Sequence, residues 1–299
     1  MAISENWAYL LEPGLREVFY VQRDALAAES KIPLLFNQIT SAKATEAFVG
    51  AGGMNDWPEY KGAIEYDDLE QLFKTTLTHA EYVKGFKVER KLVDDDQYNI
   101  INTRPRELAL SAMRSREKAA ANIFINCATS GTGGDSSYLC VSTHDYSPTN
   151  GAHQSNVGST ALSYAALNAT RLLMRAWEDD RGELVQCMPD TLLVPAELEE
   201  TAFAIYRTMN QVDTTDYHAN FVGSWLKQVI VWDYLTDAND WWLIDSKLAK
   251  MYNYWVDRIP LEFEMDPTSD FRLEARFRGY MRYSVGWSDW RWVYGHIVT

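Results

Sequence analysis

The chain has 299 residues, 46% of them hydrophobic, with a net charge of −14 at pH 7 and a pI near 4.8. This composition is typical of a globular protein and excludes a disordered chain, and the acidity argues against sequence-independent DNA binding, which needs clustered Lys and Arg. The three cysteines are too few and too widely spaced for a disulfide framework or a zinc knuckle, and they indicate a reducing compartment.

The first residues, MAISENWAYLL, lack a basic segment followed by an apolar run, so we expect no secretory signal. No apolar run approaches the ~18 residues of a membrane span. Residues 1–54 mix short apolar groups with polar runs and end in Gly50-Ala51-Gly52-Gly53. They predict an extended arm with one or two short helices, not an independent domain.

Residues 57–93 are polar and rich in strand formers. Apolar side chains alternate there at Tyr82, Phe86, Val88 and Leu92. Lys84 and Arg90 interrupt the same face, so burial on one side is weak. The pattern predicts a ribbon that covers another part of the structure.

Residues 94–124 predict a long helical region. Asp94-Asp95-Asp96 would complement the helix dipole in a first turn. Pro105 is tolerated near a helix start, with Asn102 or Thr103 as the N-cap. From Glu107 the sequence is dominated by helix formers, and the whole region could approach ~45 Å.

Two further helices are predicted. The first follows Ser159-Thr160, ends before Asp179-Asp180-Arg181-Gly182 and has one apolar stripe, formed by Leu162, Ala165, Ala166, Ala169, Leu172, Leu173 and Ala176. The second follows a short buried strand at 192–194 and Pro195, with helical spacing at Leu198, Ala202, Ile205, Tyr206 and Met209.

Residues 228–235 and 241–245 flank a turn at 236–240 and predict a hairpin. The longest pattern lies at 271–287, where apolar and polar residues alternate throughout. A strand of that length reaches about 55 Å and needs an equally long partner, for which the helix at 94–124 is the obvious candidate. The class is α+β, with longer elements than a compact enzyme needs.

Residues 140–156 hold most of the side chains that a hydrolase uses, namely Cys140, Ser142, Thr143, His144, Asp145 and His153. No nucleophile turn such as Gly-x-Ser-x-Gly is present. His144 and Asp145 are adjacent, so they point in different directions on an extended chain and make a poor relay. We therefore predict a polar surface loop here.

Three other segments can be interpreted either as binding sites or as ordinary turns and helix starts. Residues 131–137 (GTGGDSS) suggest a phosphate cradle, but no Lys-Ser/Thr follows, which favours a flexible turn. Asp94-Asp95-Asp96 and the residues from Asp237 to Asp240 are explained without a metal, by a helix start and a turn. The five histidines lack metal-ligand spacing. We therefore predict no catalytic, cofactor-binding or metal residues and no cofactor.

Arginines and tryptophans cluster near the C-terminus. Four arginines share one face of the long strand, and carboxylate pairing is favoured over nucleic-acid binding for Arg272, Arg276, Arg278 and Arg282. Burial or interface anchoring is favoured over base stacking for Trp287, Trp290 and Trp292.

The order of these parts resembles the major capsid proteins of tailed double-stranded DNA bacteriophages, in particular the Mu-type major head subunit family. The most specific segments are LVDDDQYNIIN (92–102), STHDYS (142–147) with the SN and ALS that follow, and LLVPAELEETA (192–202). The similarity spans essentially the whole chain.

The resemblance implies a Hong Kong 97-type capsid fold. It would divide the chain into an N-terminal arm (1–54), an extended β-hairpin loop (55–93), and a peripheral domain with the spine helix (94–183). An axial α/β domain (184–262) would follow, and then the long strand that returns to the peripheral domain with the C-terminus (263–299).

The implied function is structural: self-assembly through pentamers and hexamers into an icosahedral shell around double-stranded DNA, without catalysis or sequence-specific DNA binding and away from membranes. The subunit would assemble in the host bacterial cytoplasm and reside in the virion. Expected partners are a portal, a decoration protein and a separate scaffolding protein, because about 54 residues before the loop are too few for a built-in scaffold. Some relatives form Lys–Asn cross-links, but no residue here can be assigned that role. The alternatives are an encapsulin-type nanocompartment subunit and a hydrolase that uses residues 140–156.

Overall fold

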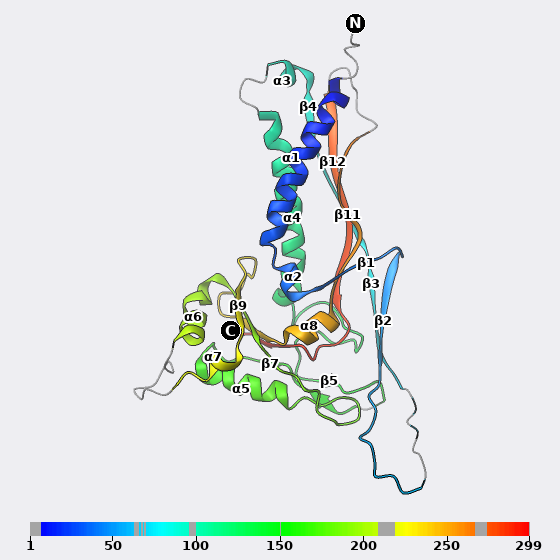
Figure 1. Ribbon diagram of the computed structural model, residues 1–299, viewed down its shortest axis with the longest axis vertical. Coiled ribbons are helices and arrows are strands. Elements are labelled where there is room, and N and C mark those ends of the chain that lie inside the picture. Colours follow the sequence, from blue (N-terminus) through cyan, green and yellow to red (C-terminus); the bar gives the residue numbers. More distant parts are fainter. Residues whose placement is uncertain are drawn as a thin grey trace.

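The protein is elongated in its computed structural model (Figure 1), which describes residues 7–62, 66, 68, 70–95, 100–149, 151–208, 219–266 and 274–298. Figure 1 shows a tall part, in which long helices lie beside long strands, with a broader part below it. A hairpin projects downward on one side. Among the described residues, no helix has both the length and the hydropathy needed to cross a membrane.

The tall part is built on a four-stranded sheet in the order β1-β11-β12-β4. The central strand β12 (Glu274–Trp287) pairs antiparallel with β11 (Asn253–Met265) and with β4 (Ala80–Glu89). On the other side of β11 lies β1 (Asn37–Thr40), in parallel orientation. The predicted long strand is confirmed from residue 274 onward; residues 271–273 lie outside the described part.

The sheet supplies the partners that the long strand needs. Helix α4 (Thr103–Ile125) packs against β12, and Leu108 lies over Gly279. The expectation that this helix alone would be the partner was wrong, because side-chain packing does not satisfy the backbone N–H and C=O groups of a strand. Those groups bond to β11 and β4.

The helical region at 94–124 is not one helix from its start. Helix α3 (Arg90–Asp94) ends at Asp94, so this carboxylate lies at a helix C-terminus and not in a first turn. The 3₁₀ turn η1 (Ile100–Asn102) then leads into α4, with Asn102 in the N-cap position. Pro105 explains the start, since proline fits the first turn of a helix but not its interior.

The N-terminal segment corrects the prediction of an extended arm. Helix α1 (Trp7–Glu29) is as long as α4 and packs alongside it, and the short α2 (Ile32–Leu35) follows. Pro13 lies inside α1 and costs about 3 kcal/mol. Burial of Leu15 and Phe19 against the core contributes roughly 2–3 kcal/mol each, which exceeds that cost.

The projecting hairpin consists of β2 (Thr45–Ala51) and β3 (Gln71–Thr78), which pair antiparallel. Phe48 stacks on Tyr254 of β11, with ring centroids 3.9 Å apart. The polar segment predicted at 57–93 therefore supplies two different structures. β3 belongs to this hairpin, and β4 forms the edge of the tall sheet.

The broader part contains a five-stranded sheet in the order β7-β13-β10-β8-β9. These strands are β7 (Val157–Gly158), β13 (Val293–His296), β10 (Trp241–Ile244), β8 (Thr191–Val194) and β9 (Gln228–Val231). The prediction that residues 228–235 and 241–245 form a hairpin was wrong. β9 and β10 both pair with β8, which lies between them, because the apolar β8 is buried on both faces and takes an interior position in the sheet.

Helices α5 (Tyr164–Arg175) and α6 (Glu199–Arg207) pack on this sheet, and α7 (Val222–Trp225) contacts both of them, whereas α8 (Ser246–Tyr252) packs on β11 and β1 of the tall sheet. The helix predicted after Pro195 is confirmed as the 3₁₀ turn η2 (Ala196–Leu198) followed by α6; Met209 lies outside the described residues.

Helix α5 corrects two expectations. Its N-cap is Ser163, whose Oγ accepts from the Ala166 N–H at 3.1 Å, and not the predicted Ser159. The face that it buries carries Ala166, Leu167, Thr170 and Met174. Most of the predicted apolar stripe is instead exposed, at Ala165, Ala169, Leu172, Leu173 and Ala176.

Aromatic side chains join the two sheets. Phe124, at the end of α4, contacts the rings of Trp232, Trp242 and Trp292 with centroid separations of 5.8–6.1 Å. Nearby, Glu117 is buried and accepts hydrogen bonds from the Ser30 hydroxyl and, at 3.0 Å, from the Trp232 indole N–H. This carboxylate ties the α1–α2 connection and the region after β9 to the long helix.

Removing that carboxylate should weaken the junction. We expect Glu117→Ala to lower the free energy of unfolding by about 2–3 kcal/mol, because two buried donors lose their acceptor. Glu107→Ala is the matched control, since Glu107 lies on the same helix but is 66% exposed and, among the described residues, pairs with Arg104 alone. It should change stability by less than about 0.5 kcal/mol. Urea unfolding of the unassembled subunit measures both, and equal effects would contradict the assignment.

A second buried polar group makes stability depend on pH. His296 is buried and stacks on Trp241 at 4.0 Å. Its Nδ1 accepts from the Thr160 N–H at 3.2 Å, and its Nε2 lies 2.8 Å from the Thr170 hydroxyl, which donates to Ala166. The ring is therefore held neutral with the proton on Nε2, and burial lowers its pKa to about 4.

This lowered pKa predicts a loss of stability in acid. Between pH 6.5 and about 4 the unfolded chain binds a proton that the folded chain does not, so stability falls as the pH drops through this window. The contribution lost by pH 4 is about 3 kcal/mol. We expect His296→Asn to be less stable than the original at pH 7 and to lose less stability on acidification. Urea unfolding at pH 7 and pH 4.5 gives the double difference, and identical pH slopes would contradict the prediction.

Candidate assembly site

The segment 140–156 is only in part the predicted surface loop: Ser142, Thr143 and residues 151–153 are exposed, but other polar side chains of the segment are buried. Strands β5 (His144–Asp145) and β6 (His153–Gln154) form a small antiparallel pair within it. His144 and Asn156 have no exposed surface. Buried polar groups need hydrogen-bond partners, and the fold provides them.

His144 is the centre of a buried network. Its Nδ1 lies 2.6 Å from Asp135 Oδ2, and its Nε2 lies 3.2 Å from Asn156 Oδ1. Its ring stacks on Trp290 with a centroid separation of 4.4 Å. The Asn156 amide donates in turn to the carbonyls of Leu139 and Val293. Both imidazole nitrogens are engaged, so neither is available to activate a nucleophile.

The other reactive side chains of the segment do not meet this imidazole. Cys140 is buried beside Cys127, and burial raises the pKa of its thiol well above the ordinary value. His153 pairs with Asp145 at 2.7 Å, and both are partly exposed at the surface. The two pairs of imidazole and carboxylate are thus separate, and neither forms the relay that a hydrolase requires.

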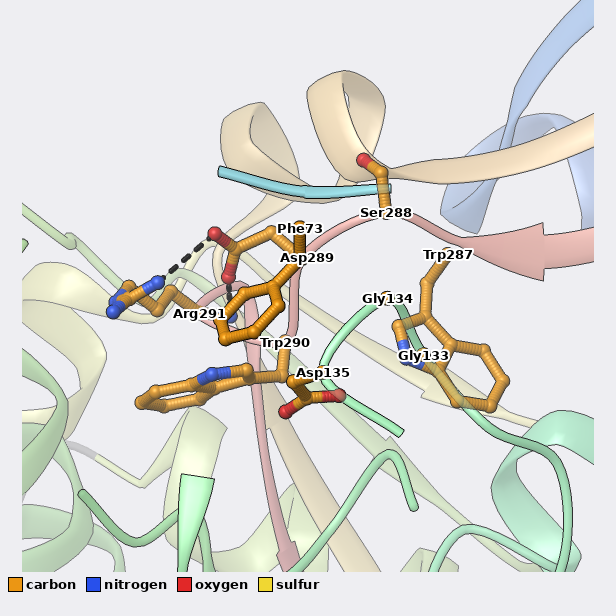
Figure 2. Close-up of a pocket in the computed structure, with 9 residues that line it drawn as sticks. All are labelled: Phe73, Gly133, Gly134, Asp135, Trp287, Ser288, Asp289, Trp290 and Arg291. Carbon is orange, nitrogen blue, oxygen red and sulfur yellow. Dashed lines mark hydrogen bonds and ion pairs between the residues drawn. The ribbon is translucent and has the colours of Figure 1, made fainter. Parts of the chain in front are cut away.

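The glycine-rich turn at 131–137 holds an indole ring. Figure 2 shows Gly133, Gly134 and Asp135 beside Trp287. A Cβ added at Gly133 would lie 2.9 Å from the indole Nε1 of Trp287, so only glycine allows this approach. The hollow here has a volume of about 20 Å³, which is the size of a water molecule and too small for a phosphate. The turn positions Asp135 against His144, and no spacing pattern indicates that pair in advance.

The arginines of the long strand pair with carboxylates, as predicted. Arg276 contacts Glu274, Arg278 lies 3.3 Å from Glu264, and Arg282 lies 3.2 Å from Glu81. Arg272 lies outside the described residues. The neighbouring carboxylates offset the positive charge of these guanidinium groups, which weakens their attraction for nucleic-acid phosphates.

The tryptophan prediction is also confirmed, because Trp287, Trp290 and Trp292 are all buried. At Asp237–Asp240, the Asp237 side chain accepts from the Asn239 N–H at 2.8 Å, as expected of a turn. In the described part of the chain, no three His, Cys, Asp or Glu residues cluster as metal ligands would.

The surface features that need a partner lie elsewhere. The connection between β2 and β3 carries large apolar side chains that are 73–95% exposed, at Met54, Trp57, Tyr60 and Tyr66. Exposed aromatic clusters of this kind mark protein–protein interfaces. In Figure 1 this connection forms the lowest point of the molecule, far from the tall sheet.

The base of this connection is fixed to the rest of the subunit. The Gly53 N–H donates to Asp180 Oδ1 at 3.0 Å, and the Arg181 guanidinium donates to the Asp68 carbonyl at 3.2 Å. The Thr149 hydroxyl donates to Glu70 at 2.5 Å. These contacts set the direction of the hairpin while its aromatic tip stays in solvent.

A groove of about 310 Å³ runs between β4 and α4. Its walls include Tyr82, Leu108, Leu261 and Met281. β4 is the edge of its sheet, so one side of its backbone faces away from β12. The exposed tip, the groove and the open edge are the parts of this subunit suited to contacts with other chains.

The two histidines of the segment give a matched pair of variants. We expect His144→Ala to lower the free energy of unfolding by about 3 kcal/mol, because it empties a buried site and leaves Asp135 without its partner. His153→Ala, at an exposed pair, should change it by less than about 1 kcal/mol. Thermal and urea unfolding of both variants measure this, and a neutral His144→Ala would contradict the structural role.

Comparison with known proteins bears on what these surfaces do. A family model described as phage capsid protein matches residues 73–295, and no curated protein matches the chain. The capsid of a native GTA particle has a similar fold, with a TM-score of 0.58 at 13% identity over 90% of each chain.

Two further solved structures share the fold. The capsid of bacteriophage JBD30, decorated with minor capsid protein trimers, has a TM-score of 0.55 at 14% identity, over 69% of this chain and 91% of that chain. A virus-like particle from Pyrococcus furiosus has a TM-score of 0.54 at 10% identity, over 95% of this chain and 98% of that chain. With most of its length matched by the family model, the chain belongs to the phage capsid protein family and is a major capsid protein that forms the shell.

Proposed function

We propose that this chain assembles through pentamers and hexamers into the icosahedral shell that encloses the double-stranded DNA of a tailed phage. The proposal includes the Hong Kong 97-type fold and the Mu-type head subunit subfamily. One observation carries it: a long helix beside long strands, with a projecting hairpin whose aromatic tip is exposed in the single subunit. Such a tip gains its burial from a neighbouring chain.

The hairpin is the element that we propose reaches across to the neighbour. A two-stranded ribbon is marginally stable alone, and this one is held mainly at its base. Burying Trp57 and Tyr60 on another subunit would stabilise both the ribbon and the contact. Side chains this large are the usual anchors of protein interfaces.

The chain divides, on this proposal, into the arm (1–54), the extended loop (55–93), the peripheral domain (94–183), the axial domain (184–262) and the returning strand (263–299). The two separate sheets support a division into peripheral and axial parts. Strand β11 continues past the proposed end of the axial domain at residue 262. The hairpin β2–β3 corresponds best to the proposed extended loop.

We propose that packaged DNA is enclosed without specific binding. The chain carries 42 acidic against 28 basic residues, and the strand arginines are already paired. A net negative surface repels phosphate and leaves the DNA free to be released. The subunit would assemble in the host cytoplasm with a separate scaffolding protein and a portal, and a decoration protein would bind the finished virion.

Non-catalytic function is part of the same proposal, supported by the buried thiol of Cys140 and the engaged nitrogens of His144. The nanocompartment alternative shares the fold, but the family match is to phage capsid proteins and favours the virion.

Negative-stain microscopy of the expressed chain, with and without the other head proteins of its genome, tests the shell. Closed particles are the expected result. A chain that stays monomeric at all salt and protein concentrations, with scaffolding protein present, would contradict it. Isolation with a bound cargo-enzyme tail in place of DNA would favour the nanocompartment.

The hairpin tip gives a sharper test. We expect the double variant Trp57→Ser, Tyr60→Ser to reduce particle yield at least about tenfold, because the proposed anchors are lost. The conservative variant Trp57→Phe should retain most assembly. Since both side chains are exposed in the subunit, its melting temperature should not change. Full assembly of the double variant would remove the tip from the proposed interface.

A further inference from the structure

Helix α5 carries an apolar face that no described residue of the subunit covers. Leu172 and Leu173 are 62% and 52% exposed, and Ala165, Ala169 and Ala176 extend the same surface. The helix is already anchored by its other face, through Leu167 and Met174. Exposed leucines on an anchored helix indicate a contact with another molecule.

The same helix is a basic element in an acidic protein. Between Ala161 and Trp177 the only charged residues are Arg171 and Arg175. The Arg171 guanidinium lies 5.2 Å from the ring centre of Phe221 and 5.1 Å from that of Trp225. Within the described part of the chain, neither arginine forms an ion pair.

A complementary acidic surface lies at the start of helix α6. Glu197, Glu199 and Glu200 are exposed at η2 and the first turn of α6, and none of them forms an ion pair with a described residue. Helix α6 packs on β8 and the edge strand β9, whereas α5 packs on β10. Figure 1 shows α7 between the two helices, so the basic and acidic surfaces lie apart.

We propose that the α5 face of one subunit packs against the acidic start of α6 of a second copy. The inference rests on the proposed shell function and names one contact within its rings. Two different patches on one chain make a head-to-tail contact, which closes into a ring when each subunit is rotated by the same angle. The leucines supply the apolar centre, and the unpaired charges fix the register.

The charges disfavour a symmetric contact between two α5 helices. Such a contact would bring Arg171 and Arg175 of both copies together, and neither helix carries a carboxylate of its own. Burial and the neighbouring Arg175 already lower the pKa of Arg171, which is consistent with a guanidinium that lacks a counter-ion. The acidic partner surface on α6 supplies that counter-ion only in the head-to-tail arrangement.

Charge reversal on each patch tests the contact. Arg175→Glu alone, and Glu199→Lys with Glu200→Lys in a second variant, should each reduce ring and particle yield at least about tenfold, because like charges then face each other. Mixing the two variants should restore rings, since alternating subunits again oppose unlike charges at every contact. Only even-numbered rings can alternate in this way, so hexamers should return and pentamers should not.

Controls separate the interface from folding and from the proposed function. Arg106→Glu, an exposed reversal on α4, should assemble normally, and all variants should keep the melting temperature of the original subunit. Leu172→Ser with Leu173→Ser should also prevent ring formation. Native mass spectrometry and microscopy provide the readouts.

The outcomes are distinct. If the original chain assembles and the α5 and α6 variants assemble equally well, the contact is overturned and the shell function stands. If the α5 variants assemble but lose an added decoration protein, α5 binds a different protein and the contact is again overturned. If the original chain never associates, both proposals fail together.

Discussion

The backbone of β12 has to find hydrogen-bond partners along fourteen residues, and the rest of the molecule is arranged to supply them. β11 and β4 pair with it on either side, and α4 covers the face where Phe277 and Met281 are buried. α1 packs alongside α4 and also contacts β11, where Phe19 stacks on Phe263 at 5.0 Å. The two helices thus bury the apolar face of the sheet together.

Burial also explains the segment that most resembles an active site. His144 has the neighbours of a catalytic histidine, namely a carboxylate at 2.6 Å and an amide, but its ring is enclosed by Trp290 and has no exposed surface. A catalytic group must reach its substrate. Here the same interactions connect the turn at 131–137, the strand pair β5–β6 and the C-terminal tryptophans. Because His144 is buried among them, its role is to stabilise the fold.

Sequence patterns predicted the elements whose signal is local. The alternation at 271–287 identified β12, a composition rich in helix formers identified α4, and helical spacing identified α6. Pairing was not predictable from such patterns: the turn at 236–240 indicated a reversal, but no local signal showed that β8 would lie between β9 and β10. The pair of Asp135 and His144 was missed for the same reason, because it depends on a turn packed under Trp287. Apolar spacing in α5 located a stripe without showing whether the subunit itself would cover it.

The passage from β12 to β13 has a mechanical consequence. Arg291, in the connection, donates to the Glu178 carbonyl at 3.0 Å and pairs with Asp289, and the tryptophans on either side of it are buried. One continuous chain segment thus crosses from one sheet to the other through a corner held by these contacts, beside the small hollow next to Trp287. Bending between the two sheets would have to break these contacts, so we expect changes in the curvature of a shell to be accommodated where subunits meet.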